Sequence, residues 1–303
     1  MAELSIVTGA FGYTGRYIAK ELIAEGGRVR TLTNHPGDAA LLGGAVEVAP
    51  LNFQRPADLV KRLLGASTLY NTYWVRFPRR GVSFQRAVDN TAVLVKAAEE
   101  AGVSRVVHVS ITNAWEDSRL PYFRGKGVVE RLITESQMSF AILRPTVIFG
   151  PGDILVNNIA WLLRNYPVFP VFGSGEYLIQ PVFVEDLAEM AVRLGHQDGN
   201  ITLDAVGPET YTYEEMVRVI ARQVGSKARV VHVAPGVALF LARLLSYLVR
   251  DILVTKDEIR GLMSGLLVSE GAPTCPTKLS QWLDSNSHLL GTRYASEVAR
   301  HYR

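Results

Sequence analysis

The chain has 303 residues, of which 48% are hydrophobic and 20% are charged. This composition excludes a disordered or fibrous chain and supplies enough apolar residues for a sizeable core. The 32 Lys and Arg residues exceed the 29 Asp and Glu residues by only three, so we expect no nucleic-acid partner. The length allows two domains, or one large sheet with an added lobe.

Two features of the sequence bear on the cellular compartment. Cys275 is the only cysteine and cannot form an internal disulfide, which is typical of a reducing compartment. The first 25 residues do not have the pattern of a signal peptide, and the apolar segment 237–249 is shorter than the ~20 residues that span a bilayer. We therefore expect a cytoplasmic protein without a transmembrane segment.

Short β-branched segments alternate with helical patterns through the first half of the chain. This order is typical of βαβ units and a parallel sheet. The patterns predict strands at residues 4–8, 28–33, 45–49, 68–72, 105–110 and 140–143, and helices at residues 14–25, 58–64, 84–101 and 121–135. The predicted fold class is α/β, with a Rossmann-like doubly wound parallel sheet.

The pattern changes after the glycine- and proline-rich segment 150–153, where the elements become longer and less regular. We expect a Rossmann domain at residues 1–152, with residues 181–206 returning to it. Residues 153–303 are expected to form a smaller, mostly helical C-terminal lobe that binds the substrate. Helices are predicted at residues 213–224 and beyond residue 237.

The first predicted strand leads into a glycine turn and then into a helix. Gly9, Gly12 and Gly15 are spaced three residues apart, with Phe11 and Tyr13 between them. Gly9 would make the tight turn, Gly12 would let the backbone approach a pyrophosphate, and Gly15 would let the helix pack on the strand. The helix N-terminus would then face the anion. A packing turn without ligand is the alternative, but the flanking strand and helix favour a dinucleotide.

The end of the second predicted strand bears on the choice of dinucleotide. The sequence Thr33-Asn34-His35 has no carboxylate to bind the ribose 2′-hydroxyl of NAD or to repel the 2′-phosphate of NADP. Asn34, His35 and Arg30 could donate hydrogen bonds to that phosphate. Arg16 is a further candidate donor. We therefore favour NADP(H), with NAD(H) as the alternative, and assign Asn34 to the cofactor site.

A tyrosine and a lysine lie four residues apart near the start of a predicted helix. Tyr122 and Lys126 would therefore share one helix face. A tyrosine with a pKa near ~10 is a poor proton shuttle at neutral pH, and an adjacent cation favours the phenolate. By itself such a pair is more typical of a solvated helix surface. Its place after the fifth strand, which ends in the hydroxyls of Ser110 and Thr112, favours a ligand site.

Together these motifs resemble an extended or atypical short-chain dehydrogenase/reductase, in an order that covers nearly the whole chain. The matching parts are segments 8–15, 109–112 and 143–151, the Tyr122 and Lys126 pair, and the later segments 180–188 and 207–212. The chain is similar to the branch that includes the nucleotide-binding 39 kDa accessory subunit of respiratory complex I. The resemblance implies an NAD(P)-dependent dehydrogenase, reductase or epimerase-like enzyme.

The resemblance also implies roles for the matching residues. Tyr122 corresponds to the general acid/base, and Lys126 to the residue that binds the nicotinamide ribose and lowers the tyrosine pKa. Thr112 corresponds to the hydroxyl that orients the substrate oxygen, and Ser110 is the competing candidate on the same strand face. The remaining implied cofactor contacts are Asn52 at the adenine, Tyr73 and Trp74 along the cofactor, and Pro145 at the nicotinamide end.

Two departures from the family bear on the substrate. Tyr122 follows Thr112 by only ten residues, which predicts a short loop over the substrate. Ile179 occupies the position where sugar-nucleotide epimerases tend to carry an arginine, which argues against a nucleotide-sugar substrate. Large apolar residues in the second half are consistent with a pocket for a lipid, quinone, terpenoid or phenolic substrate, although for any single residue a plain hydrophobic core is the commoner explanation.

Other classes of site find little support. The six histidines never occur four residues apart and no Cys-x-x-Cys is present, so no metal site is expected. The alternative to an enzyme is a non-catalytic NADP(H)-binding redox sensor or assembly protein. The presence of both Tyr122 and Lys126 favours an enzyme, because a protein that only binds the nucleotide needs the lysine but not the phenol. A mixed helix at residues 235–250 allows peripheral membrane association, and we expect a monomer or a homodimer.

Overall fold

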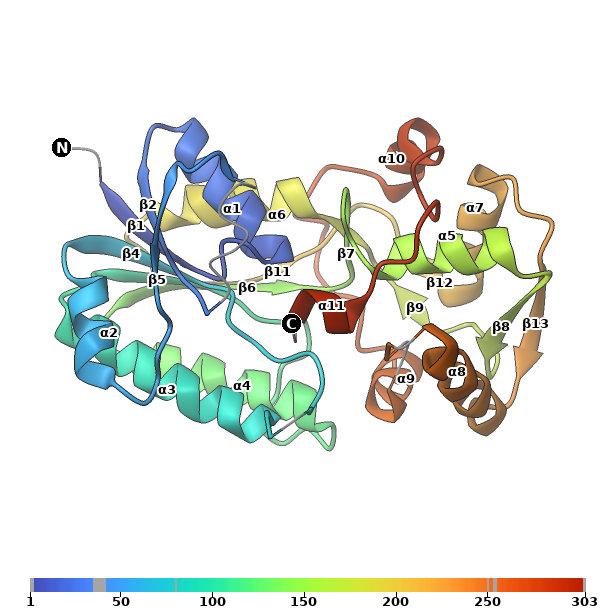
Figure 1. The fold of residues 1–303 in the computed structure, drawn as a ribbon, viewed down its shortest axis with the longest axis horizontal. Coiled ribbons are helices and arrows are strands. Elements are labelled where there is room, and N and C mark those ends of the chain that lie inside the picture. Colours follow the sequence, from blue (N-terminus) through green and yellow to red (C-terminus); the bar gives the residue numbers. More distant parts are fainter. Residues whose placement is uncertain (1–2, 35–41, 80, 250, 253–254, 302–303) are drawn as a thin grey trace. The chain divides into compact units, whose positions relative to one another are not determined.

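The computed structural model describes residues 3–34, 42–79, 81–249, 251–252 and 255–301 (Figure 1). The chain divides into two compact units. Unit 1 comprises residues 1–145 and 184–205, and unit 2 comprises residues 146–183 and 206–303. No helix within the described residues combines the length and the apolar character that a bilayer span requires.

Unit 1 is built on a seven-stranded sheet with the order β11-β6-β5-β4-β1-β2-β3. All neighbouring strands are parallel. The strands are β1 (Leu4–Thr8), β2 (Arg28–Leu32), β3 (Val46–Ala49), β4 (Ala66–Asn71), β5 (Arg105–Val109), β6 (Ser139–Pro145) and β11 (Ile201–Ala205). The first six strands have the doubly wound order 3-2-1-4-5-6. The predicted α/β fold class is therefore confirmed.

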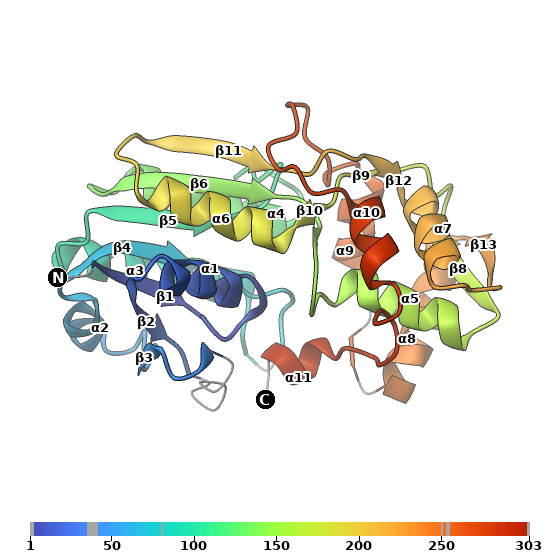
Figure 2. The ribbon, with the colours of Figure 1, turned by 90° about the horizontal axis from the view of Figure 1, so that it is seen from above.

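Helices cover both faces of this sheet (Figures 1 and 2). On one face lie α1 (Tyr13–Ala24) and α6 (Val184–Gly195), which contact each other. On the other face lie α2 (Pro56–Leu63), α3 (Phe84–Glu100) and α4 (Pro121–Thr134). Every residue of β1 and β5 is buried, as expected for central parallel strands covered on both sides.

The core of unit 1 explains why the helices pack as they do. On the α2–α4 face, apolar residues from the sheet meet the apolar stripes of the helices, including Ile6, Leu69, Leu94, Val129 and Ile142. Gly102 follows α3 with a φ of +77°, a conformation that favours glycine and ends the helix.

Unit 2 combines three short strand pairs with helices. The parallel pairs are β7 (Ile148–Phe149) with β10 (Val182–Phe183) and β8 (Val168–Phe172) with β13 (Arg229–Val233). The antiparallel pair is β9 (Leu178–Ile179) with β12 (Tyr211–Thr212). The helices are α5 (Leu155–Asn165), α7 (Tyr213–Gln223), α8 (Pro235–Val249), α9 (Lys256–Met263), α10 (Leu279–Asn286) and α11 (Glu297–His301).

Unit 2 is mostly helical, as predicted, and these strand pairs are its main elements that the sequence analysis did not predict. Strand β8 has the sequence VFPVF and pairs with a strand about 60 residues further along the chain. Such short segments carry little local signal, because their partners are distant in sequence and the proline weakens the strand pattern. Leu163 and Phe169, which could have lined a pocket, belong to the hydrophobic core of unit 2.

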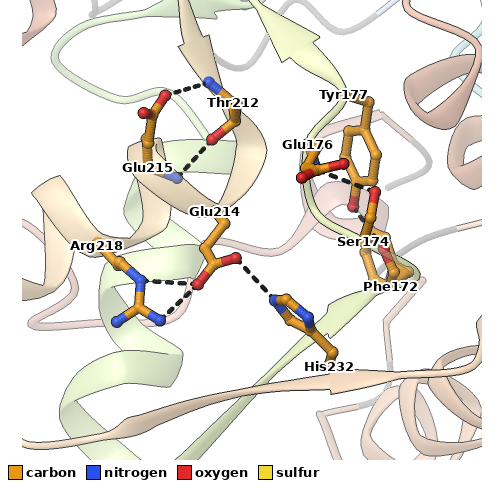
Figure 3. Close-up of polar contacts among 9 residues, drawn as sticks. All are labelled: Phe172, Ser174, Glu176, Tyr177, Thr212, Glu214, Glu215, Arg218 and His232. Carbon is orange, nitrogen blue, oxygen red and sulfur yellow. Dashed lines mark hydrogen bonds and ion pairs between the residues drawn. The ribbon is translucent and has the colours of Figure 1, made fainter.

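A cluster of charged side chains connects α7 to β13 through polar contacts (Figure 3). Glu214 on α7 accepts hydrogen bonds from Arg218 Nε at 2.8 Å and Nη2 at 2.5 Å, and its second oxygen lies 2.7 Å from His232 Nε2 on β13. The same helix begins with a capping box, in which the Thr212 hydroxyl and the Glu215 carboxylate each accept a backbone N–H.

Candidate dinucleotide and acid/base site

The turn between β1 and α1 has the backbone geometry that its glycines predict. Gly9 adopts a φ of +66°, and its N–H donates to the carbonyl of Leu32 at 3.1 Å. Gly12 closes the turn by donating its N–H to Gly9 O at 2.8 Å. A Cβ atom at Gly15 would lie 2.4 Å from Gly9 O, so a glycine is needed for the helix to approach the turn this closely.

The N-terminus of α1 suits an anionic group. Within the described residues, Gly12 precedes the helix without a capping side chain, and the first turn contains no acidic residue. A Cβ at Gly12 would come near Gly9 O alone, at 3.1 Å. The backbone at Gly12 is therefore open to a ligand, and the amide groups and helix dipole would favour a phosphate there.

A buried hydroxyl joins the ends of β1 and β4 beneath this turn. Thr8 Oγ1 accepts the backbone N–H of Thr72 at 2.8 Å and of Tyr73 at 3.1 Å, and it lies 3.1 Å from Asn71 Oδ1. The Thr72 hydroxyl donates in return to Thr8 O at 2.5 Å. Thr8 therefore fixes the carboxyl ends of two adjacent strands. Sequence reasoning missed this residue, because a threonine at a strand end is common.

The other predicted cofactor residues lie on unit 1. Asn34 is exposed directly after β2, while His35 lies outside the described residues. Asn52 is exposed and accepts the N–H of Gln54 at 3.0 Å. The Pro145 carbonyl, at the end of β6, accepts the N–H of Thr112 at 2.9 Å.

The aromatic residues assigned to the cofactor are partly buried. Tyr73 packs against Phe53 with ring centroids 4.9 Å apart, and its hydroxyl accepts a hydrogen bond from Asn90 at 2.8 Å. Phe11 is half-buried in the glycine turn, and Tyr13 makes an edge contact with Tyr17 at 5.9 Å. These rings have both protein contacts and partly open surface.

Tyr122 lies in the first turn of α4, within an aromatic cluster. Its ring meets those of Trp74, Phe84 and Phe123 edge-on, with centroid distances of 5.8, 5.7 and 5.6 Å. The side chain is half-buried. The cluster restricts the orientation of the phenol ring.

Lys126, one turn further along α4, is only 3% exposed. Its Nζ donates to the carbonyl of Val109 at 2.8 Å, at the carboxyl end of β5, and lies 4.7 Å from the ring centroid of Trp74. Burial lowers the pKa of Lys126 to about 7, and the negative charge of Glu130 opposes this shift. The lysine therefore differs sharply from a solvated surface residue.

Two glycines let α4 pack closely against the segments that follow β4 and β5. A Cβ at Gly125 would lie 2.9 Å from the Trp74 ring, and a Cβ at Gly127 would lie 2.6 Å from the backbone nitrogen of Glu116. Larger residues on either side of Lys126 would push the helix away. The Gly-Lys-Gly sequence was a signal for this burial that the sequence analysis did not use.

A histidine lies beneath Lys126. His108 on β5 is fully buried, and its Nδ1 lies 3.1 Å from Asn71 Nδ2 and 3.2 Å from Asn71 O. Burial, together with the charge of Lys126, holds the pKa of His108 well below its usual value. His108 is therefore neutral at physiological pH.

Ser110 and Thr112, the two candidate hydroxyls, have different surroundings. The Ser110 hydroxyl donates to Glu130 Oε1 at 2.5 Å, and Glu130 forms a bidentate ion pair with Arg144 at distances from 2.5 to 3.1 Å. Thr112 is 1% exposed, with its backbone held by Pro145. The Ser110 hydroxyl is thus part of a buried ion-pair network.

Part of this chain matches a family model, and the chain is similar to several known proteins. Residues 9–152 match the model of an NAD(P)H-binding family. The chain is 26% identical over 288 residues to the mitochondrial NADH dehydrogenase (ubiquinone) 1 alpha subcomplex subunit 9 of Arabidopsis thaliana, covering 89% of this chain and 72% of that protein. It is 29% identical over 238 residues to a ceramide reductase of Caulobacter vibrioides, covering 76% of this chain and 74% of that protein.

A solved structure extends the comparison to the fold. A nucleoside-diphosphate-sugar epimerase from Staphylococcus aureus superposes with a TM-score of 0.70 at 16% identity, covering 94% of this chain and 100% of that one. This likeness concerns the fold alone. Residues 9–152 therefore correspond to an NAD(P)H-binding domain, the chain is similar in sequence to a mitochondrial NADH dehydrogenase subunit, and its fold is that of the epimerase.

Proposed function

We propose that this protein is an NAD(P)-dependent oxidoreductase that acts on a carbonyl or alcohol carbon of an apolar small molecule. The observation that carries this proposal is the buried Lys126, held against the end of β5 one helical turn from Tyr122. Burial of an amine destabilises its charged form, and ionisable groups perturbed in this way occur most often at functional sites. The glycines on both sides of Lys126 support a close approach to the sheet edge, where doubly wound folds bind ligands.

The proposed mechanism uses Tyr122 as general acid/base. When bound, the nicotinamide supplies or accepts the hydride. Tyr122 would give a proton to the substrate oxygen during reduction and take it back during oxidation, at its phenol oxygen. The ammonium of Lys126 would stabilise the phenolate and donate hydrogen bonds to the nicotinamide ribose. Thr112 would orient the substrate oxygen, because the Ser110 hydroxyl is already engaged by Glu130.

The proposed cofactor is NADP(H), with NAD(H) as the alternative. The Gly9–Gly15 turn and the uncapped N-terminus of α1 suit the pyrophosphate. Asn34 is exposed at the end of β2 and carries no negative charge, which favours a 2′-phosphate over a bare 2′-hydroxyl.

Two observations support an apolar substrate. Ile179 is fully buried in the core of unit 2 and offers no cation for a sugar diphosphate. The relative from Caulobacter vibrioides is named a ceramide reductase, so its substrate is a lipid. A long-chain ketone or an N-acylated amino ketone is therefore the first compound to test.

The test is turnover of such ketones by the parent and by Tyr122→Phe, followed by nicotinamide absorbance. The variant should bind cofactor nearly normally and lose roughly 10² to 10⁴ in kcat. Thr112→Ala should lose more activity than Ser110→Ala. Tyr166→Phe is the matched control, because Tyr166 lies in unit 2 and packs on Trp161. Unchanged turnover in Tyr122→Phe would contradict the mechanism.

A second candidate function is non-catalytic nucleotide binding in an assembly or redox-sensing role. It is favoured by the Arabidopsis relative, which matches over 89% of this chain and is named as a subunit of a larger enzyme. Tight NADP(H) binding by a parent protein that reduces none of a broad panel of carbonyl compounds would favour this alternative.

A further inference from the structure

Helix α8 of unit 2 presents large apolar side chains to solvent. Val237, Phe240, Leu244 and Tyr247 have exposed fractions of 50%, 67%, 54% and 83%. They are spaced by three, four and three residues, so they form one stripe along the helix. We call these four residues the α8 stripe. Apolar residues scattered singly on a surface are ordinary, but a continuous stripe of this kind marks an interaction site.

The rest of α8 accounts for its attachment to unit 2. The helix contacts β8, and Leu239, Ala242 and Leu245 are half-buried. At 100° per residue these three positions fall on the side of the helix away from the α8 stripe. The helix therefore packs through one apolar side and leaves a second apolar side uncovered. An ordinary surface helix has a polar outer side instead.

The charges in the segment that contains α8 indicate what covers this helix. No Asp or Glu occurs between residues 216 and 250, a segment that contains six Lys or Arg residues and His232. Arg243 is exposed and lies within the same half of the helix as the α8 stripe, close to Tyr247 in angle. The charged end of a long basic side chain beside an apolar stripe can reach a polar region. Its methylene groups remain in contact with the apolar surface.

From these observations we propose that α8 docks on the surface of a bilayer that contains anionic lipids. Phe240 and Leu244 would enter the boundary between headgroups and acyl chains, and the amphipathic ring of Tyr247 suits the same depth. Arg243 would pair with lipid phosphates. Segment 216–250 carries basic and no acidic side chains, which complements an anionic surface. The proposal concerns unit 2 alone, and it stands whether or not the proposed enzymatic function is correct.

The first experiment is flotation of the full chain with vesicles of phosphatidylcholine and phosphatidylglycerol at 3:1, and with phosphatidylcholine alone. We expect binding to the anionic vesicles that weakens as NaCl rises from 0.05 to 0.5 M. Phe240→Asp should reduce the partition coefficient at least tenfold. Arg243→Gln should reduce it about fivefold, the equivalent of the ~1 kcal/mol that one basic residue contributes near an anionic surface.

Leu289 provides the matched control, because it is an isolated apolar residue of unit 2 with a similar exposed fraction of 63%. Leu289→Asp should bind vesicles like the parent. A second pair of variants reports insertion into the bilayer directly. The fluorescence of the tryptophan introduced by Phe240→Trp should be quenched by lipids that are brominated in the acyl chain. The fluorescence of the tryptophan introduced by Leu289→Trp should not be quenched.

Three results would overturn the proposal. One is a parent protein that does not float with the anionic vesicles. Another is a Phe240→Asp variant that binds them as well as the parent does. The third is a parent dimer that Phe240→Asp converts to a monomer, since the α8 stripe would then be covered by a second copy of this chain.

Discussion

Replacement of Lys126 by methionine tests whether the burial of this lysine has the energetic consequence that the structure indicates. Methionine is unbranched and similar in length, so it can occupy the same space without a charge. Lys126 is 3% exposed, and burial lowers its pKa from 10.5 to about 7. Between these two values the unfolded chain binds a proton at this lysine that the folded protein does not bind. The parent should therefore gain stability as the pH rises through this window.

The size of the effect follows from the two pKa values. Between pH 7 and pH 9.5 the parent should gain about 3 kcal/mol of unfolding free energy relative to Lys126→Met. Lys126→Met also loses the hydrogen bond to Val109 and the contact with Trp74. This loss changes the unfolding free energy of the variant by an amount that depends little on pH. His108 does not complicate the comparison, because its pKa lies well below its usual value in the parent.

Urea unfolding at pH 7, 8, 9 and 9.5 would measure this difference, with the parent and the variant compared at each pH. Lys96→Met is the control, because Lys96 is exposed on α3 and its replacement removes the same charge. The unfolding free energy of Lys96→Met should change with pH in the same way as that of the parent. If the parent and Lys126→Met also gave parallel curves, Lys126 would have an ordinary pKa and the argument from burial would be refuted.

Three further predictions concern other parts of the chain. Gly15→Ala should lower the unfolding free energy in urea by about 1 to 3 kcal/mol and weaken dinucleotide binding in calorimetry, because its Cβ would lie 2.4 Å from Gly9 O. Gly199 has open space around it, so Gly199→Ala should lower the unfolding free energy much less. Asn34→Asp should shift cofactor preference toward NAD(H), measured as the ratio of the two dissociation constants; an unchanged ratio would mean that Asn34 is not near the ribose. Hydrogen bonds from Arg218 and His232 lower the pKa of Glu214, so that carboxylate stabilises unit 2 above its ordinary pKa and loses this effect as the pH falls through the lowered value. The midpoint temperature of thermal unfolding should therefore fall more steeply between pH 6 and pH 3 for the parent than for Glu214→Gln. Equal slopes for the two proteins would contradict this role of Glu214.

The sequence predicted unit 1 well because its signals are local. Most strands of the doubly wound sheet are short segments rich in β-branched residues, and glycines such as Gly9 and Gly102 mark turns with positive φ values. Unit 2 was predicted less well, because β8 and β13 pair across about 60 residues and neither segment reveals its partner. Helix α8 was predicted from composition, but its uncovered side appears only once the contact with β8 is known.

In the candidate site, sequence spacing identified the Tyr122 and Lys126 pair but not the environment of either residue. The polar groups linked to His108 come from three strands, and only the fold brings them together. Thr8 and Asn71 reach His108 across β1, β4 and β5. No pattern in the sequence links these positions, because they are separated by 37 residues or more.

The arrangement under α4 limits the number of charges that this part of unit 1 can hold. Lys126 and His108 are both buried, and each positive charge would raise the cost of the other. Burial removes the charge from His108, whereas Glu130 favours the charged form of Lys126. Of these two buried groups, Lys126 is the one that carries a charge over part of the neutral pH range, because its pKa is about 7. Ribose hydroxyls that accept hydrogen bonds from Lys126 Nζ would raise its pKa from about 7 back toward the ordinary value. Cofactor binding at pH 8 should therefore take up protons, and Lys126→Met should abolish that uptake.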